Sequence, residues 1–266
     1  MSHVEISWPL ENVAQLTLFG TEVHNFSDWQ LQTRLEESLQ EVQENDARVV
    51  ILCSQVDGYF IAHGHIRQLV ATFVDGNLDG DPMAAIRVQK GLETGPMVSI
   101  AAVEGQAWGG GAELALACDL RVVSRSATLA FHEVLVGTHP AGGVTRMTRL
   151  AGEATAKHLL LDGRPVSGEE AHRLGLAHRV TAPGEALKTA IDWAGWLVSH
   201  PPGALAQNKE LINEIRGLTY RDSLRLETAK FLERFQDPDF VARIRQVQSR
   251  YDEGADSYEA FGMEKG

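Results

Sequence analysis

The feature that most constrains the fold is a run of three consecutive glycines, Gly109 to Gly111, between a strand and a helix. A continuous apolar run, VSIAAV, predicts a strand at residues 98–103 that is covered on both faces, and residues 112–118 have a helical pattern. Glycines at such a junction let the backbone approach a ligand closely. The helix start adds free N–H groups and a partial positive charge. The junction is therefore expected to bind a phosphate or an oxyanion, unless it is only a tight turn.

The rest of the chain alternates strand and helix patterns. Further strands are predicted at residues 13–18, 49–53, 120–123 and 128–131. A capping pattern at Ser27 and Gln30 predicts a helix start, and Ser167 with Glu170 predicts another. Residues 66–94 contain helical pieces broken by a polar loop at residues 75–82, the best candidate for a mobile segment.

From about Gly184 onward the pattern is mostly helical. Strands that alternate with helices and are followed by a helical tail favour an α/β fold. We expect a core at residues 1–200 and a C-terminal helical section at residues 201–266. The boundary falls near the helix-breaking sequence His200-Pro201-Pro202-Gly203.

The composition is that of an ordinary globular protein, with 44% hydrophobic residues. Its 24 basic and 36 acidic residues give a net charge of −12, which argues against binding nucleic acid or anionic lipid but not a small anionic ligand. Cys53 and Cys118 lie in apolar runs, as buried free thiols do in a reducing compartment. The chain begins without a secretory pattern, and no run reaches the ~18 apolar residues of a membrane helix. We therefore expect a cytoplasmic protein that does not insert into membranes.

Two glutamates follow the predicted strands in apolar surroundings. Glu113 lies just inside the helix after the glycines, where the helix dipole favours a carboxylate. Glu133 follows a strand, and burial of a glutamate raises its pKa toward the value that a general acid needs. Together with the glycine turn they could move protons beside a carbonyl group, although each also has an ordinary structural explanation.

Histidines are concentrated in two of the same segments. His63 and His65 flank Gly64, which could offer a backbone N–H at the start of the next helix. With His132 and His139 they could instead form a metal site, but no metal-binding signature appears and we expect no metal. These side chains are interpreted as polar residues that line or flank a cleft.

Several of these segments together resemble the crotonase, or enoyl-CoA hydratase/isomerase, superfamily. The similarity extends over nearly the whole chain, in the family's order. The matching segments are VAQLTL with EVHN, FIAHGHI, IAAVEGQAWGGGAELALACDLRV, FHEVLVGTHPAGGVTR, LLLDGRPVSGEEAHRLGLAHRV and PPGALAQNKELIN.

The resemblance implies a spiral of ββα repeats with a C-terminal helical section that builds homotrimers, often paired as hexamers. It implies acyl thioesters of coenzyme A as substrates, with no cofactor beyond the coenzyme A that the substrate carries. The backbone N–H groups of Gly64 and Gly110 match the family's oxyanion hole. Ala62 matches the position that contacts adenine.

The resemblance also implies a reaction. Hydratases of the family carry two glutamates, which match Glu113 and Glu133, and add water across the double bond of a 2-enoyl thioester. His63, His65 and His132 stand where the family often has Gly, Asp and Pro. They lie near the acyl or coenzyme A cleft and, with His139, are candidate substrate-binding residues. Isomerisation, decarboxylation and C–C hydrolysis through the same enolate are alternatives, as is a non-catalytic acyl-CoA-binding subunit.

Overall fold

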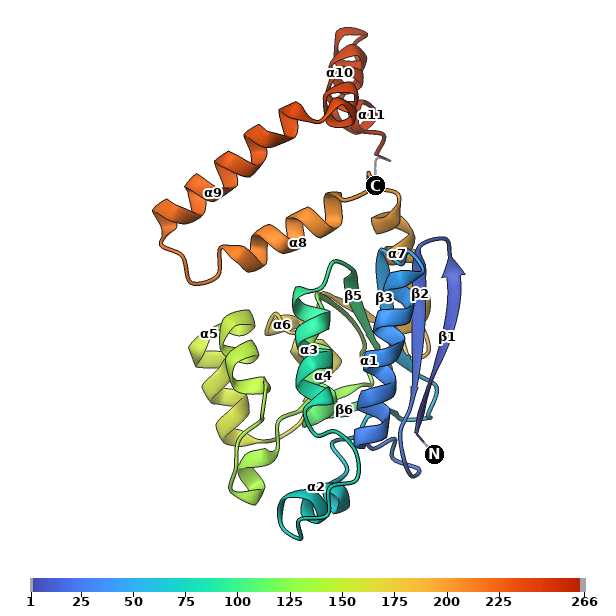
Figure 1. Cartoon of the computed structure of the whole chain (residues 1–266), viewed down its shortest axis with the longest axis vertical. Coiled ribbons are helices and arrows are strands. Elements are labelled where there is room, and N and C mark those ends of the chain that lie inside the picture. Colours follow the sequence, from blue (N-terminus) through green and yellow to red (C-terminus); the bar gives the residue numbers. More distant parts are fainter. Residues whose placement is uncertain (1, 264–266) are drawn as a thin grey trace. The chain divides into compact units, whose positions relative to one another are not determined.

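Two β-sheets form the centre of the computed structural model, which describes residues 2–263 (Figure 1). The larger sheet has the spatial order β1-β2-β3-β5-β7-β10, with β1 and β2 antiparallel and the other neighbours parallel. Its strands are β1 His3–Leu10, β2 Val13–Phe19, β3 Val49–Ser54, β5 Val98–Val103, β7 Leu120–Ser124 and β10 Arg179–Thr181.

The smaller sheet repeats the path of the larger one. Its order is β4-β6-β8-β9, and β4, β6 and β8 run parallel while β9 is antiparallel to β8. Its strands are β4 Tyr59–Ile61, β6 Gln106–Trp108, β8 Thr128–Ala130 and β9 Val166–Ser167. The pairs β3 and β4, β5 and β6, and β7 and β8 each place one strand in each sheet. The predicted α/β class is confirmed, and this alternation is the predicted succession of ββα units.

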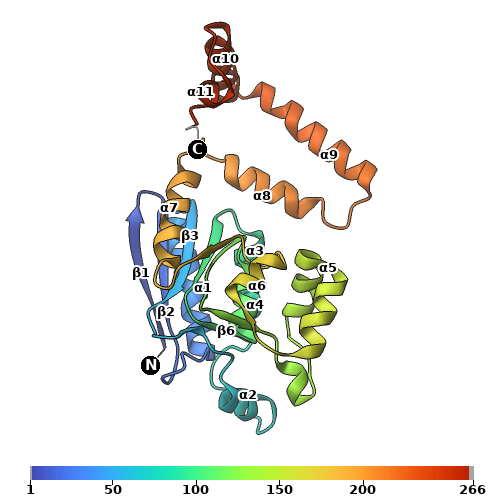
Figure 2. The ribbon, with the colours of Figure 1, turned by 180° about the vertical axis from the view of Figure 1, so that it is seen from behind.

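Helices cover the sheets on opposite sides. Figure 1 shows α1 and α3 in front of the larger sheet, and Figure 2 shows α7 on its other face. The helices of this part are α1 Trp29–Glu44, α2 Ile66–Phe73, α3 Ala84–Thr94, α4 Gly110–Ala117, the 3₁₀ helix η1 Glu133–Val136, α5 Gly143–Asp162, α6 Gly168–Arg173 and α7 Ala186–Val198. Residues 74–83 between α2 and α3 are irregular, in agreement with the predicted break.

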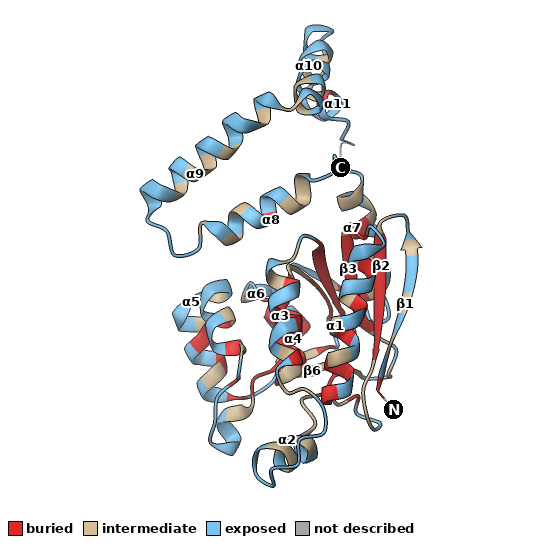
Figure 3. Cartoon of the chain, in the orientation of Figure 1, coloured by how far each residue is buried: buried red, intermediate tan, exposed pale blue. Residues whose placement is uncertain are grey.

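The central strands are buried on both faces, as their continuous apolar runs predict. In β3, Val49 and Ile51 pack on the side of α7, whereas Val50 and Leu52 belong to the larger cluster with α1, α3 and α4. This division follows from the period of two in a strand. Figure 3 shows the resulting continuous band of buried strand residues beneath exposed helix faces. Both cysteines are buried and free, as expected.

The start of α1 differs from the prediction by one residue. Asp28, not Ser27, is the N-cap, and its carboxylate accepts a hydrogen bond from the Leu31 N–H at 2.7 Å. Ser27 is instead drawn into a bridge with Gly64, a tertiary contact that no capping pattern can indicate. The second predicted cap is correct: the Ser167 hydroxyl accepts from the Glu170 N–H at 3.1 Å and begins α6.

The contacts divide the chain into two units, one ending at Glu210 and the other beginning at Leu211. The remaining helices are α8 Ala204–Glu214, α9 Tyr220–Glu233, η2 Arg234–Gln236, α10 Pro238–Asp252 and α11 Ser257–Phe261. The first part of α8 belongs to the first unit because Lys209 is buried there and binds Asp119 at 2.6 Å. The assignment of residues 201–266 to one helical section stays a prediction. Within residues 2–263, no helix is both long and apolar enough to cross a membrane.

Candidate active site

Each of the three consecutive glycines meets a different structural need. Gly109 has φ +48° and ψ −120°, a conformation that side chains other than hydrogen rarely allow. Gly111 packs so closely on β4 that a Cβ would lie 2.1 Å from the carbonyl oxygen of Ile61. Gly110 is the first residue of α4, so its N–H has no partner within the helix. The junction is therefore built to bring a helix start against the end of β4.

The segment after β4 lies beside this helix start. The Ser27 N–H donates to the His63 carbonyl at 2.9 Å, and the His65 N–H donates to the Ser27 carbonyl at 2.8 Å. This bridge does not engage the N–H of Gly64. A Cβ on Gly110 would lie 3.5 Å from the Gly64 nitrogen, so the two backbone segments lie next to each other. Two N–H groups arranged in this way can stabilise a developing oxyanion.

Glu113 is held by the start of another helix. It is 6% exposed, and its Oε1 accepts hydrogen bonds from the N–H groups of Gly142 at 2.8 Å and Gly143 at 3.0 Å. Gly142 is the N-cap of α5 and Gly143 is its first residue. The backbone thus fixes the Glu113 carboxylate through one oxygen, and neither of these two bonds uses Oε2.

Glu133 lies against the glycine turn at Gly109. It is the first residue of η1, and its Oε1 would be 3.0 Å from a Cβ on Gly109. Its Oε2 is buried without a hydrogen-bond partner among the described residues. Burial raises the pKa of Glu133. A hydrogen bond to backbone acts to lower this pKa, and the negative charge of Glu113 acts to raise it. Glu113 is thus a carboxylate that accepts two N–H hydrogen bonds, whereas the surroundings of Glu133 favour its protonated form.

Aromatic and imidazole rings form a continuous series beside these groups. Phe26 stacks on His63 with centroids 4.4 Å apart, His63 lies 5.9 Å from His132, and His132 lies 5.7 Å from Trp108. Nδ1 of His63 lies 2.6 Å from the Gly64 carbonyl oxygen, and because a carbonyl can only accept, Nδ1 is the donor in this contact. Burial and the neighbouring His63 lower the pKa of His132. Its Nδ1 is buried with no hydrogen-bond partner among the described residues.

The other candidate residues make local contacts. His65 is the N-cap of α2, where Nδ1 accepts from the Gln68 N–H at 3.2 Å and Nε2 faces Glu22 at 3.4 Å. His139 is exposed and bonds the Pro140 carbonyl at 3.0 Å. Ala62 is buried directly after β4. In residues 2–263, no three His, Cys, Asp or Glu side chains gather as metal ligands would.

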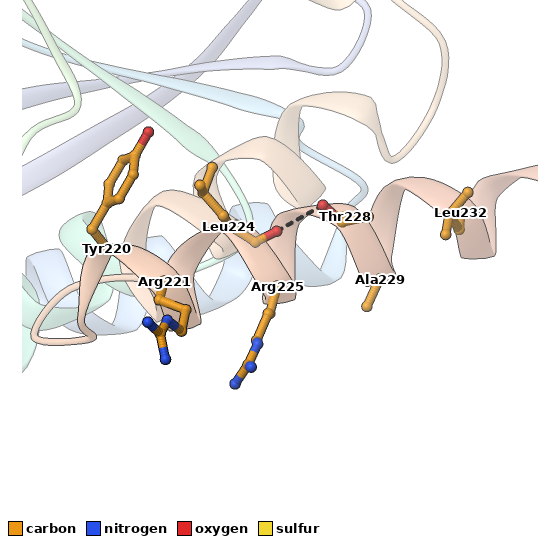
Figure 4. A pocket seen from close by; sticks show the side chains of 7 residues that line it. All are labelled: Tyr220, Arg221, Leu224, Arg225, Thr228, Ala229 and Leu232. Atoms are coloured by element: carbon orange, nitrogen blue, oxygen red, sulfur yellow. Dashed lines mark hydrogen bonds between the residues drawn. The ribbon is translucent and has the colours of Figure 1, made fainter.

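A hollow on the second unit contains none of these groups. It lies along one face of α9, as Figure 4 shows, and its residues all come from that helix. The side chains that line it are Tyr220, Arg221, Leu224, Arg225, Thr228, Ala229 and Leu232. The Thr228 hydroxyl is occupied by a 2.7 Å hydrogen bond to the Leu224 carbonyl. The chemistry-bearing residues therefore belong to the first unit.

The sequence-based prediction missed the backbone groups that hold Glu113 and two of the aromatic rings. The N–H groups of Gly142 and Gly143 hold Glu113, and the Pro-Ala-Gly-Gly sequence before a helical pattern is the signal that could have indicated them. Phe26 and Trp108 complete the ring series, but single aromatic residues in loops or short strands carry no such signal.

Comparison with known proteins agrees with this geometry. Residues 10–255 match the family model of enoyl-CoA hydratase/isomerase. A short-chain-enoyl-CoA hydratase of Clostridium acetobutylicum is 34% identical over 200 residues, which are 74% of this chain and 76% of that protein. Crystal structures of enoyl-CoA hydratases from Bacillus anthracis and Polaromonas sp. JS666 each superpose with a TM-score of 0.83, at 26% and 28% identity. Each superposition covers 94% of this chain and 96% of the hydratase chain.

The chain belongs to the enoyl-CoA hydratase/isomerase family, within the crotonase superfamily. The family resemblance found in the sequence is therefore confirmed. The family's enzymes use coenzyme A thioesters as substrates, and membership in this family groups the chain with enzymes.

Proposed function

We propose that the protein is an enoyl-CoA hydratase, which adds water across the 2,3 double bond of an acyl-CoA thioester. The observation that carries the proposal is the pair of glutamates at the glycine turn: Glu113 in the first turn of α4, and Glu133 against Gly109. One carboxylate accepts two backbone N–H bonds, while burial favours the protonated form of the other. Such a difference in environment assigns the roles of base and acid to two like groups.

The N–H groups of Gly64 and Gly110 bind the thioester oxygen. When water attacks C3 of the enoyl group, electrons move through C2 and C1, and negative charge develops on that oxygen. Two donors already in place stabilise this enolate without reorganisation. Ala62, directly after β4, is proposed to contact the adenine of coenzyme A, as the family resemblance implies.

Glu113 and Glu133 then handle the protons. As the oxygen of the water bonds to C3, the water gives a proton to Glu113. The carboxylate oxygen that accepts this proton is Oε2, which Gly142 and Gly143 do not hold. Glu133 gives its proton to C2 as the enolate collapses to the hydroxyacyl thioester. C3 thus gains the hydroxyl group and C2 gains a proton. Transfer of the second proton from Glu113 to Glu133 then restores the starting protonation of both glutamates.

His63 and His132 line the acyl side of the same site. Both lie 3.5 Å from the position of a Cβ on Gly109, the first through its Cβ and the second through its Cε1. An imidazole pair can hydrogen-bond a polar group, so the preferred acyl chain carries a hydroxyl, carbonyl or carboxylate near C4. Substrate contact by His65 and His139 stays a prediction, as do the homotrimer or hexamer and the cytoplasmic location.

Double-bond isomerisation is the second candidate. It needs one group that moves a proton between C2 and C4, and Glu133, whose Oε2 has no partner among the described residues, is suited to this. The test is incubation of the enzyme with enoyl-CoA thioesters of several chain lengths. Hydration removes the absorbance of the conjugated thioester and adds the mass of one water, whereas isomerisation leaves the mass unchanged. Binding without either product would support a non-catalytic subunit.

A further inference from the structure

We propose that Arg146 is a positioning residue, which orients Glu113 through the peptide group between Gly142 and Gly143. The inference rests on the proposed catalytic role of Glu113. Nη1 of Arg146 donates to the Gly142 carbonyl at 3.2 Å. The N–H at the other end of this same peptide group, that of Gly143, donates to Glu113 Oε1 at 3.0 Å. One peptide plane therefore connects a guanidinium group to the proposed base.

The guanidinium group is itself fixed from α3. Nη1 donates to Oε1 of Gln89 at 2.6 Å, and Nη2 pairs with Glu93 at 3.2 Å. Gln89 is buried, and the side chains of Arg146 and Glu93 are 15% and 23% exposed. Ion pairs shielded in this way are less screened by solvent than surface pairs. Arg146 therefore has little freedom to leave the Gly142 carbonyl.

Two physical consequences follow for Glu113. A cation at the carbonyl end polarises the peptide group, which makes the N–H at the other end a stronger donor. The fixed peptide plane also sets the direction of that N–H, so the carboxylate is held in one orientation toward the water. Arg146 contacts none of the proposed reacting groups directly, so its loss should lower kcat and leave KM almost unchanged.

The test compares Arg146→Met with Arg149→Met, which removes an exposed arginine from the same helix. We expect R146M to lower kcat about 10- to 100-fold, the effect of a displaced catalytic group, with KM within twofold and no change for R149M. In an E113Q background, R146M should cause no further loss, because both changes act through one carboxylate. Equal losses in both backgrounds, or a kcat per folded molecule within twofold of wild type, would overturn the proposal.

A second measurement does not depend on turnover. In protein labelled with ¹⁵N-glycine, E113Q should shift the amide signals of both Gly142 and Gly143. R146M should shift Gly143 more than Gly142, because only the Gly143 N–H shares a peptide group with the carbonyl that Arg146 binds. Unchanged glycine signals in R146M would overturn the positioning role. If these shifts occur while wild-type protein turns over no enoyl thioester, the proposed function fails but the connection to Glu113 stands.

Discussion

A Cβ on Gly110 would lie 3.5 Å from the backbone nitrogen of Gly64, within ordinary contact distance. A methyl group at Gly110 would therefore fit sterically while occupying space next to a proposed oxyanion donor. We expect Gly110→Ala to fold normally and to lower kcat/KM by about 100-fold or more, because the methyl group blocks the thioester oxygen from the Gly64 N–H and so removes the effect of one oxyanion donor. Thermal unfolding and turnover of enoyl-CoA check the two statements.

Gly64→Ala is the matched control for this change. A Cβ at Gly64 would meet only the Cδ1 atom of Leu69, at 3.9 Å, and the backbone N–H would remain. We expect activity within about threefold of wild type, because this methyl group does not contact Gly110 and so blocks neither donor. Equal losses of activity in both variants would contradict the assigned position of the oxyanion.

The two glutamates give a prediction on turnover. Glu133→Gln and Glu113→Gln keep nearly the same volume but remove a group that can exchange a proton. Each is expected to lower kcat by about 100-fold or more, the contribution of general acid–base catalysis. Circular dichroism should show an intact fold in both. A variant that retains wild-type kcat would remove its glutamate from the mechanism.

The raised pKa of Glu133 predicts a dependence of stability on pH. Above the unfolded pKa of about 4.3 the folded state still binds a proton that the unfolded state has lost, so wild-type stability falls as pH rises through the folded pKa. Glu133→Gln has no carboxyl group at this position, so its free energy of unfolding does not fall in this way as the pH rises. The variant should be more stable than wild type at pH 8, and the difference should disappear below about pH 4. Urea denaturation at several pH values measures it, and a difference that does not vary with pH would contradict the assignment.

His63 and His132 predict a substrate preference. His63→Gly and His132→Pro introduce residues common at these positions in the family and remove the hydrogen-bonding rings. We expect the ratio of kcat/KM for polar acyl chains to that for crotonyl-CoA to fall about tenfold, the loss expected for a missing polar contact. His158→Ala, at an exposed site in α5, is the control. A ratio unchanged in both variants would exclude these histidines from acyl recognition.

The buried ammonium group of Lys209 in α8 gives a prediction on stability. Its ammonium group binds Asp119 at 2.6 Å and the carbonyls of Leu92 at 2.6 Å and Met97 at 2.7 Å, in a position that is 8% exposed. Lys209→Met leaves these acceptors without their donor. The free energy of unfolding should fall by about 3 kcal/mol. Lys188→Met, at an exposed 4.0 Å pair, should change it by less than about 0.5 kcal/mol.

Local patterns were sufficient for most of the fold. The apolar run at 98–103 gave the bounds of β5 correctly, because a strand buried on both faces needs a continuous apolar stretch. The α1 cap was misplaced by one residue, because both Ser27 and Asp28 can cap a helix and the choice depends on which is used elsewhere. The backbone of Ser27 pairs with Gly64 in a β-bridge, so Asp28 is the residue that caps the helix.

The sequence alone indicated the candidate residues for the site: a glycine junction at a helix start, Glu113 inside that helix, and Glu133 after a strand. These depend on neighbours within one turn or one strand, and short-range sterics and helix electrostatics decide them. Only the tertiary structure decided which groups meet. Glu113 reaches the α5 N-terminus across 29 residues, and Arg146 reaches Gln89 across 57. Such contacts follow from how the two sheets and their helices pack, so the orientation of each carboxyl group was set by folding and not by any local pattern.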